Sequence, residues 1–172
     1  ASGNSASATQ TISVIDTTIP ILILPDNLEI EAENILTKIE ELGEIISEDF
    51  SGISSISNDA PEVFPLGETI VTWTATDTSG NSASSTQTIS VIDTTSPVIE
   101  QPVNVTVDAT SKSINTISLD SINVIESISD VEITNNAPLY YEFGETIVTW
   151  TATDTSGNSA SSTQTISVID TT

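Results

Sequence analysis

Apolar and polar residues alternate along most of this chain, which is the pattern of half-buried β-strands. The alternation is clear in ETIVTWTATD (68–77) and in STQTISVID (85–93). In the first stretch Val71, Trp73 and Ala75 share one face, so we expect that face to be buried. In the second stretch Ile89 and Val91 take the inner face. The pattern therefore predicts an all-β protein.

The five residues DTSGN (77–81) separate these two stretches and have the composition of a tight turn. Gly80 and Asn81 suit backbone conformations with positive φ, and the Asp77 carboxylate can accept hydrogen bonds from the backbone of the turn. We therefore predict a β-hairpin centred on this turn.

One segment has the spacing of a helix instead. ENILTKIEELGEII (33–46) places apolar residues three and four positions apart, and Gly43 is its only helix breaker. The corresponding stretch TSKSINTISLDSIN (110–123) is rich in Ser and Ile and has no such pattern. Because two copies of one fold should agree on their elements, we expect a loop with at most one helical turn, followed by a strand.

The correspondence between those stretches comes from an internal repeat. TATDTSGNSASSTQTISVIDTT occurs without change at 74–95 and 151–172, and a near copy opens the chain at 1–18. Equivalent positions are 77 residues apart, as at Thr11, Thr88 and Thr165. A period of this length predicts a complete small domain, built as a two-sheet sandwich with one Trp in its core. The expected domains are 19–95 and 96–172, and 1–18 is the last strand of a preceding repeat or a strand donated to another molecule.

Composition excludes several kinds of function. The chain has no Cys, His or Met, and Lys38 and Lys112 are its only basic residues against 25 carboxylates, for a net charge of -23. Disulfides are therefore excluded, and zinc would lack its usual ligands. Nucleic-acid binding depends on Lys and Arg contacts to phosphate, so we expect none. Membrane insertion is not expected, because no apolar run approaches the roughly 20 residues of a span.

Catalysis is not expected either. Without His or Cys, only carboxylates and hydroxyl groups remain as reactive side chains, and most of them occupy strand and turn positions. The many Ser and Thr residues suit the exposed faces of strands. We therefore predict that the chain is not an enzyme.

The segment NDAPEVFPLGETIVTWTATDTSGNSASSTQTISVIDTTSP (58–97) resembles the hyalin repeat, also called the HYR domain. The resemblance rests on FPLG (64–67), on VTWTATDTSGN (71–81) and on the final VIDTTSP. The second copy has YEFG at 141–144, which lacks the Phe-Pro pair but keeps Gly144. The resemblance implies tandem immunoglobulin-like β-sandwiches in an extracellular, cell-surface protein with an adhesive role. The absence of cysteine and the acidic composition suggest a bacterial or archaeal surface protein.

Calcium is the cofactor that this chain could hold, because hard cations prefer carboxylate and carbonyl oxygens. In an immunoglobulin-like topology the loop before the last strand lies at the same end as the N-terminus of the domain. We therefore expect two equivalent sites at the domain junctions: Asp16, Asp49 and Asp77, and Asp93, Glu126 and Asp154. The alternative is that these carboxylates only cap turns and end strands.

The remaining features concern how the repeats connect. The linkers DTTIP and DTTSP are short, and Pro20 and Pro97 restrict φ where each repeat begins, so we expect a stiff rod. NVT at 104–106 makes Asn104 a candidate glycosylation site.

We therefore expect a non-enzymatic structural module of a stalk, filament or adhesive protein. Its expected partners are neighbouring repeats and further copies, with self-association into a filament and strand addition as one route. The alternative is a ligand-binding adhesin or receptor domain that recognises a glycan or protein through residues 19–57 and 96–134. Exposed aromatic residues usually anchor such recognition, and Tyr140 and Tyr141 are the candidates, although they more readily fill the core positions of Val63 and Phe64.

Overall fold

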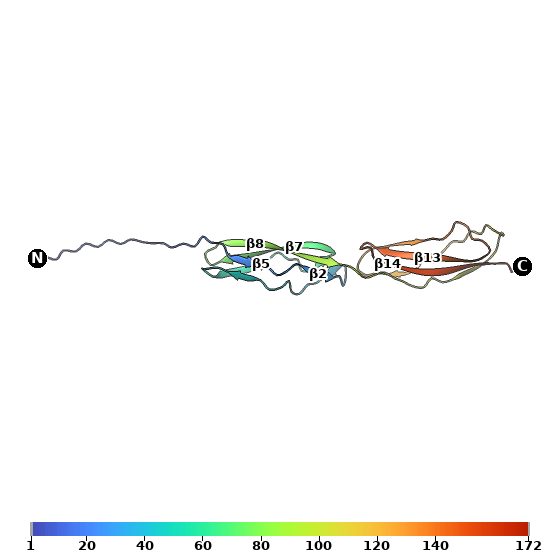
Figure 1. Cartoon of the computed structure of the whole chain (residues 1–172), viewed down its shortest axis with the longest axis horizontal. Helices are drawn as coiled ribbons and strands as arrows, with labels where there is room; N and C mark the ends of the chain where they lie inside the picture. The colour runs from blue at the N-terminus through green and yellow to red at the C-terminus, as the bar shows by residue number, and fades with distance from the viewer. Residues whose placement is uncertain (1, 172) are drawn as a thin grey trace. The chain divides into compact units, whose positions relative to one another are not determined.

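The computed structural model describes residues 2–171, and every regular element in that range is a β-strand (Figure 1). The chain separates into two compact units. Residues 2–28, 39–62 and 69–89 belong to the first unit, and residues 29–38, 63–68 and 90–171 belong to the second. No segment within 2–171 forms a helix that is long and apolar enough to cross a membrane.

A four-stranded sheet carries the first copy of the repeated sequence, in the order β2-β8-β7-β5 (Figure 1). Its strands are β2 (Leu28–Glu31), β5 (Ile53–Asn58), β7 (Gly67–Asp77) and β8 (Ser82–Ile92). The long strands β7 and β8 are joined by the DTSGN turn, as the alternation predicted. Hydroxyl pairs between Thr74 and Ser84 and between Thr76 and Ser82 connect their outer faces. The hairpin is therefore confirmed.

Two small sheets complete this copy. β1 (Ile21–Ile23) pairs with β4 (Ile46–Glu48), and β3 (Leu36–Thr37) pairs with β6 (Phe64–Pro65). Residues 33–45 contain β3 and otherwise irregular structure, with β4 following at once. Since this segment contains no helix and β4 follows it, the predicted loop followed by a strand is confirmed. The apolar residues at helical spacing do not form a buried face, because Ile35 is 67% exposed and Leu36 is 52% exposed.

The second copy repeats this arrangement with the sheet order β10-β14-β13-β12. Its strands are β10 (Val105–Asp108), β12 (Val131–Asn135), β13 (Gly144–Asp154) and β14 (Ser159–Ile169). β10 runs parallel to β14, and the other neighbours are antiparallel. β9 (Val98–Ile99) pairs with β11 (Val124–Ile125), as β1 pairs with β4.

The inner faces of the long strands form the core, as the alternation predicted. Val71, Ala75 and Ile89 are completely buried. In the second copy the buried cluster contains Tyr141, Val148, Trp150, Ile166 and Val168, and residues from the segment between β10 and β11, including Ile117, Leu119 and Ile122, pack against it. Each copy is thus an immunoglobulin-like β-sandwich, and the predicted fold class is confirmed.

The two tyrosines occupy different environments. Tyr141 is 2% exposed and fills the position that Phe64 fills in the first copy, as expected. Tyr140 is 50% exposed. Burial raises the pKa of the Tyr141 phenol.

A buried glutamine joins each tryptophan to the loops that cover it. Gln87 Oε1 accepts a hydrogen bond from Trp73 Nε1 at 3.0 Å, and Gln87 Nε2 donates to the carbonyl groups of Asp26 and Leu42. Gln164 makes the same contact with Trp150 and donates to the Val103 carbonyl. These bonds satisfy polar groups in the core and fix the last strand of each copy.

Residues 2–18 form no strand within this chain. Ile12 is 78% exposed and Val14 is 94% exposed, whereas their copies Ile166 and Val168 are completely buried. The sequence TQTISVI therefore belongs to a core strand at 163–169 and to a segment without strand structure at 9–15. Its assignment to a preceding repeat or to another molecule stays a prediction.

A candidate cation site of three aspartates

The turn between β7 and β8 is held by the carboxylate of Asp77. Its Oδ1 accepts hydrogen bonds from the backbone N–H groups of Ser79 and Asn81, both at 2.8 Å, and its Oδ2 accepts one from Asn81 Nδ2 at 2.8 Å. Gly80 adopts a φ of 93°, a conformation that favours glycine. Asp77 is therefore the cap that the sequence predicted, and its side chain is almost completely buried at 1% exposure.

Asn81 also positions Asp16. Asn81 Nδ2 donates to the backbone carbonyl of Asp16 at 3.3 Å, so one side-chain amide contacts both aspartates. The N–H and hydroxyl groups of Thr18 donate to Asp16 Oδ1. The other carboxylate oxygen of Asp16 is buried and accepts no hydrogen bond from any residue between 2 and 171.

Asp49 reaches the same place from the end of β4. Its Oδ1 accepts hydrogen bonds from the N–H and the hydroxyl group of Ser51, both at 2.8 Å. The following residue, Gly52, accepts a hydrogen bond from Thr78 N–H at 2.9 Å, which ties this loop to the turn after Asp77.

The structure therefore brings together the three residues of the first predicted set. One carboxylate oxygen from each of Asp16, Asp49 and Asp77 lies within 4.8 Å of the others. The hydrogen bonds from Thr18 hold the pKa of Asp16 below its usual value. Burial opposes ionisation of Asp77, but the bonds from Asn81, Ser79 and Gly80 outweigh it, so the pKa of Asp77 is lowered. Both groups carry negative charge at neutral pH.

The second predicted set is arranged differently. Asp93, Glu126 and Asp154 do not form a comparable group within residues 2–171. Asp93 Oδ2 accepts hydrogen bonds from Ser156 Oγ at 3.0 Å and Ser129 Oγ at 3.4 Å. Glu126 turns back on its own loop, where its Oε1 accepts from the N–H groups of Ser127 and Ile128. Hydroxyl groups thus stand beside Asp93 where a third carboxylate was expected.

The length of one loop explains this difference. Glu126 follows β11 directly, as Asp49 follows β4, so the two residues are equivalent at that end. Ile53 then pairs with Asp77, whereas Val131 pairs with Asp154, which leaves one more residue in the second loop. A β-bulge between Ile53 and Ser55 restores the common register in the first copy. The two loops therefore aim their acidic side chains in different directions.

The turn of the second junction has the same hydrogen bonds as the turn of the first. Asp154 is capped by Asn158, whose Nδ2 donates to Asp154 Oδ2 at 2.9 Å and to the Asp93 carbonyl at 3.0 Å. Burial opposes ionisation of Asp154, but the bonds from Asn158, Gly157 and Ser156 lower its pKa overall. Asn81 and Asn158 were not singled out as site residues from the sequence, although their place in the repeated DTSGN turn was a usable signal.

The predicted glycosylation residue Asn104 is exposed and has a structural contact. Its Oδ1 accepts a hydrogen bond from Thr165 N–H at 2.9 Å, as Asn27 does from Thr88. This bond joins the start of β10 to β14. The modification itself stays a prediction.

Comparison with known proteins identifies an HYR domain at residues 15–91. The chain is 38% identical over 193 residues to the hyalin of Strongylocentrotus purpuratus and 35% identical over 184 residues to the hyalin of Lytechinus variegatus. Each alignment covers 98% of this chain, which spans 15% and 35% of the two relatives. The crystal structure of Drosophila N-cadherin EC1-4 aligns with a TM-score of 0.44 and 16% identity, covering 89% of this chain and 50% of that one.

Residues 15–91 thus match the HYR domain, and nearly the whole chain is similar in sequence to two hyalins. The two hyalins are sea-urchin proteins, so they do not support the expected bacterial or archaeal source. The resemblance read from residues 58–97 is confirmed at the level of the HYR domain.

Proposed function

We propose that this chain is a non-enzymatic structural module in which tandem HYR sandwiches build a stiff stalk or filament of an adhesive, cell-surface protein. The HYR domain at 15–91 and the alignment to hyalins over 98% of the chain support an extracellular, adhesive role. The repeated sequence supports a structural role, since the 29 residues from Gly67 to Thr95 recur without change at 144–172. We assign the domains as 19–95 and 96–172, with 1–18 as the last strand of another repeat.

Calcium binding by Asp16, Asp49 and Asp77 is the central part of this proposal. Three converging carboxylate oxygens suit a hard divalent cation, which accepts six to eight oxygen ligands at about 2.3–2.6 Å. The observation that carries the proposal is the buried Asp16 Oδ2, which accepts no hydrogen bond within the described part of the chain, because a buried charged oxygen is costly unless something compensates it. The only basic side chains of the chain are Lys38 and Lys112, so a cation from solution is the natural counter-charge.

Bound calcium would stiffen the chain through residue Asp16. This residue lies in the segment before Pro20, whereas Asp49 and Asp77 belong to the loops of the first sandwich. A cation held by all three would therefore fix the linker to the loops. The second junction has hydroxyl donors beside Asp93 and is proposed to be held by hydrogen bonds and by the short proline linker. Self-association with further copies, by strand addition, completes the proposed assembly.

Isothermal titration with calcium tests the site. We expect one bound ion per chain in the wild type and none in Asp49→Asn. Glu126→Gln is the matched control, because Glu126 follows the equivalent strand but caps its own loop. The proposal is wrong if the wild type binds no calcium at millimolar concentration, or if Glu126→Gln reduces binding as much as Asp49→Asn.

A further inference from the structure

The buried glutamine beneath each tryptophan has fewer hydrogen bonds in the second copy than in the first. Gln87 Nε2 donates to two carbonyl groups, that of Asp26 at 2.8 Å and that of Leu42 at 2.9 Å. Gln164 Nε2 donates to the Val103 carbonyl at 2.6 Å and to no other group in the described part of the chain. Gln164 is only 6% exposed, so its second amide N–H lacks, within that part, the acceptor that the first copy supplies.

One difference in sequence explains the missing acceptor. Equivalent positions are 77 residues apart here, because β9 pairs with β11 in the same register as β1 pairs with β4. Gly43 follows Leu42 with a φ of 106°, and a Cβ at this position would lie 2.5 Å from Pro25 Cβ. The second copy has Asp120 in place of Gly43 and Pro102 in place of Pro25, and Asp120 does not have a positive φ. The loop of Asp120 therefore cannot approach its proline as closely as the loop of Gly43 does.

The space that this loop leaves is a pocket of about 380 Å³. Its polar lining includes the side chains of Glu100, Asp120 and Gln164, and Val105 and Ile122 supply apolar surface. Small-molecule sites in proteins are typically concave, have volumes of about 300–1,000 Å³ and combine apolar walls with a few polar groups. The pocket therefore has the size and the composition of a site for one small ligand, with a buried amide directed into it.

The pocket lies within one copy of the repeat, away from both ends of the sequence. The segments that form most of it, 100–105 and 118–123, have counterparts at 23–28 and 41–46 that the structure describes as well. The opening at Asp120 is therefore a difference between two copies that are both complete in this region.

Hydrogen bonding defines the chemistry of the ligand. Trp150 Nε1 donates to Gln164 Oε1 at 3.0 Å, which fixes the orientation of the amide and leaves its nitrogen as a donor. A ligand must therefore bring an acceptor to Gln164 and donors to the carboxylates of Glu100 and Asp120. Hydroxyl groups both donate and accept hydrogen bonds, so a molecule with several hydroxyl groups meets both requirements.

Charged ligands meet these requirements poorly. An anion would be repelled by the two carboxylates of the pocket and by the net charge of -23. A metal ion cannot accept a hydrogen bond from Gln164. Moreover, Glu100 and Asp120 belong to no group of three converging carboxylates within residues 2–171. The pocket therefore favours a neutral molecule.

We propose that this pocket binds one neutral sugar residue. Hydroxyl groups of the sugar bond to Gln164, Glu100 and Asp120, and the apolar face of its ring packs against Val105 and Ile122. The first copy fills the same place with its own loop, so the chain has one such site. Sugar recognition is a further activity beside the proposed structural role, and it does not depend on the cation site.

Nuclear magnetic resonance of the ¹⁵N-labelled full chain provides the test. The chain is titrated in EDTA with glucose, galactose, mannose and N-acetylglucosamine at millimolar concentrations. We expect at least one sugar to shift the Gln164 side-chain amide and the backbone amides of 118–123 in a saturable manner, and to leave the Gln87 amide unshifted. Glucuronic acid should bind more weakly than glucose, because its carboxylate would face Glu100 and Asp120.

Two substitutions of one residue separate the carboxylate from the open loop. Asp120→Ala removes the carboxylate but keeps the Cβ that holds the loop away from Pro102. We expect it to weaken sugar binding roughly tenfold or more, the scale of one hydrogen bond to a charged group. Asp120→Gly restores the residue of the first copy and lets the loop close, so it should abolish binding. Wild-type affinity in Asp120→Gly would overturn the proposal.

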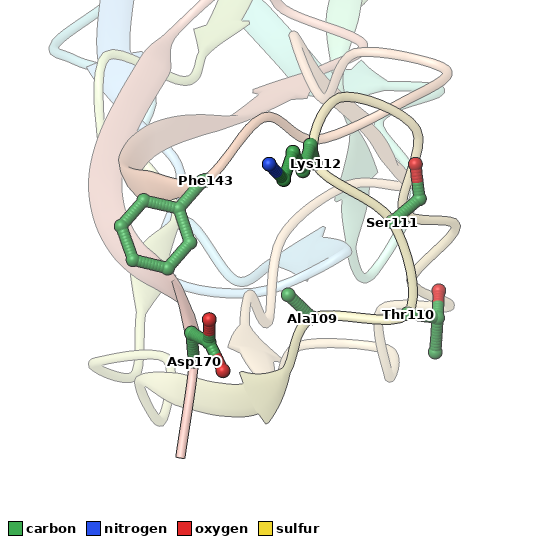
Figure 2. A pocket seen from close by; sticks show the side chains of 6 residues that line it. All are labelled: Ala109, Thr110, Ser111, Lys112, Phe143 and Asp170. Carbon is green, nitrogen blue, oxygen red and sulfur yellow. The ribbon is translucent and has the colours of Figure 1, made fainter. Parts of the chain in front are cut away.

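The larger pocket of the second copy supplies the control for location. Its volume is about 490 Å³, and Figure 2 shows the Phe143 ring and the Lys112 side chain facing one open space, with Asp170 at its edge. Exposed aromatic residues often anchor recognition, so Phe143 is the other surface on which a sugar could pack. Phe143→Ala should leave sugar affinity unchanged, and a loss of binding in this variant would overturn the assignment to the pocket of Asp120.

The remaining outcomes also decide the proposal. If none of the four sugars gives saturable shifts, water alone fills the pocket and the proposal is wrong. Shifts caused by acetyl-trialanine amide, but by no sugar, would assign the pocket to a peptide and would equally overturn it. Calcium titration of the sugar-free chain tests the cation site separately, because Asp16, Asp49 and Asp77 lie outside this pocket.

Discussion

Asn81 does not bind the cation in the proposed site, but it holds two of the three ligand residues in place. Its side-chain amide donates to the Asp77 carboxylate at 2.8 Å and to the Asp16 carbonyl at 3.3 Å. Asn81→Ala removes both bonds and leaves all three carboxylates in the chain. Residues that orient metal ligands typically contribute 10- to 100-fold to metal affinity. We therefore expect calcium to bind Asn81→Ala about 10- to 100-fold more weakly than the wild type.

The second junction supplies the control for this variant. Asn158 donates to the Asp154 carboxylate at 2.9 Å and to the Asp93 carbonyl at 3.0 Å, so Asn158→Ala loses the same two bonds. The lost carbonyl bond alone costs about 1 kcal/mol. For a domain of this size that corresponds to a fall of about 4–8 °C in the melting temperature. In EDTA both variants should therefore melt at least that much lower than the wild type.

Calcium distinguishes the two variants. Titration calorimetry should show weakened binding in Asn81→Ala and wild-type affinity in Asn158→Ala, while differential scanning calorimetry in EDTA measures the structural loss that they share. Equal calcium affinity in Asn81→Ala and the wild type would refute the reasoning. So would an equal loss of affinity in both variants, because it would mean that calcium binds at both junctions or elsewhere.

Three further predictions address pH, the core and the second junction. The pKa values of Asp77 and Asp154 in the folded chain lie below their usual value of 3.8, so the ionised carboxylates stabilise the fold above pH 3.8. The melting temperature in EDTA should therefore fall as the pH drops through and below 3.8, and Asp77→Asn should flatten part of this fall. Gln87→Leu leaves Trp73 Nε1 and two carbonyl groups unpaired, so we expect a loss of about 2–4 kcal/mol in urea unfolding followed by tryptophan fluorescence. Ser129→Asp places a carboxylate beside Asp93 and should raise the calcium stoichiometry from one to two in titration calorimetry; an unchanged stoichiometry would show that the loop length, and not the side chain, prevents binding.

The strands could be predicted well from the sequence because one face of each is buried. Alternation located Val71, Ala75 and Ile89 in the core, and the repeat transferred the same assignment to the second copy. The helical spacing at 33–46 was misleading by itself, since a pattern of apolar residues does not reveal whether a second surface covers them. Comparison of the two copies resolved it, because the second copy lacks the pattern.

The positions of the site residues could be predicted reliably only where the two copies of the repeat have loops of the same length. Asp16 and Asp77 lie in stretches that repeat without change, so their positions followed from the topology. Asp49 and Glu126 lie in divergent loops, where one additional residue redirects the acidic side chain onto its own backbone. After this loop a β-bulge in the first copy restores the common register of the two copies. A comparison by sequence position therefore does not show that the loops differ in length.

The most direct test of the central claim measures stiffness at the site itself. Because the chain has no cysteine, single cysteines at Ala8 and Ser85 can carry two spin labels, and double electron–electron resonance gives the distribution of the distance between them. We predict a narrow distribution in calcium that broadens in EDTA, and a broad distribution under both conditions in Asp16→Asn. Equal widths with and without calcium in the wild-type background would contradict the claim that a cation fixes the linker to the sandwich.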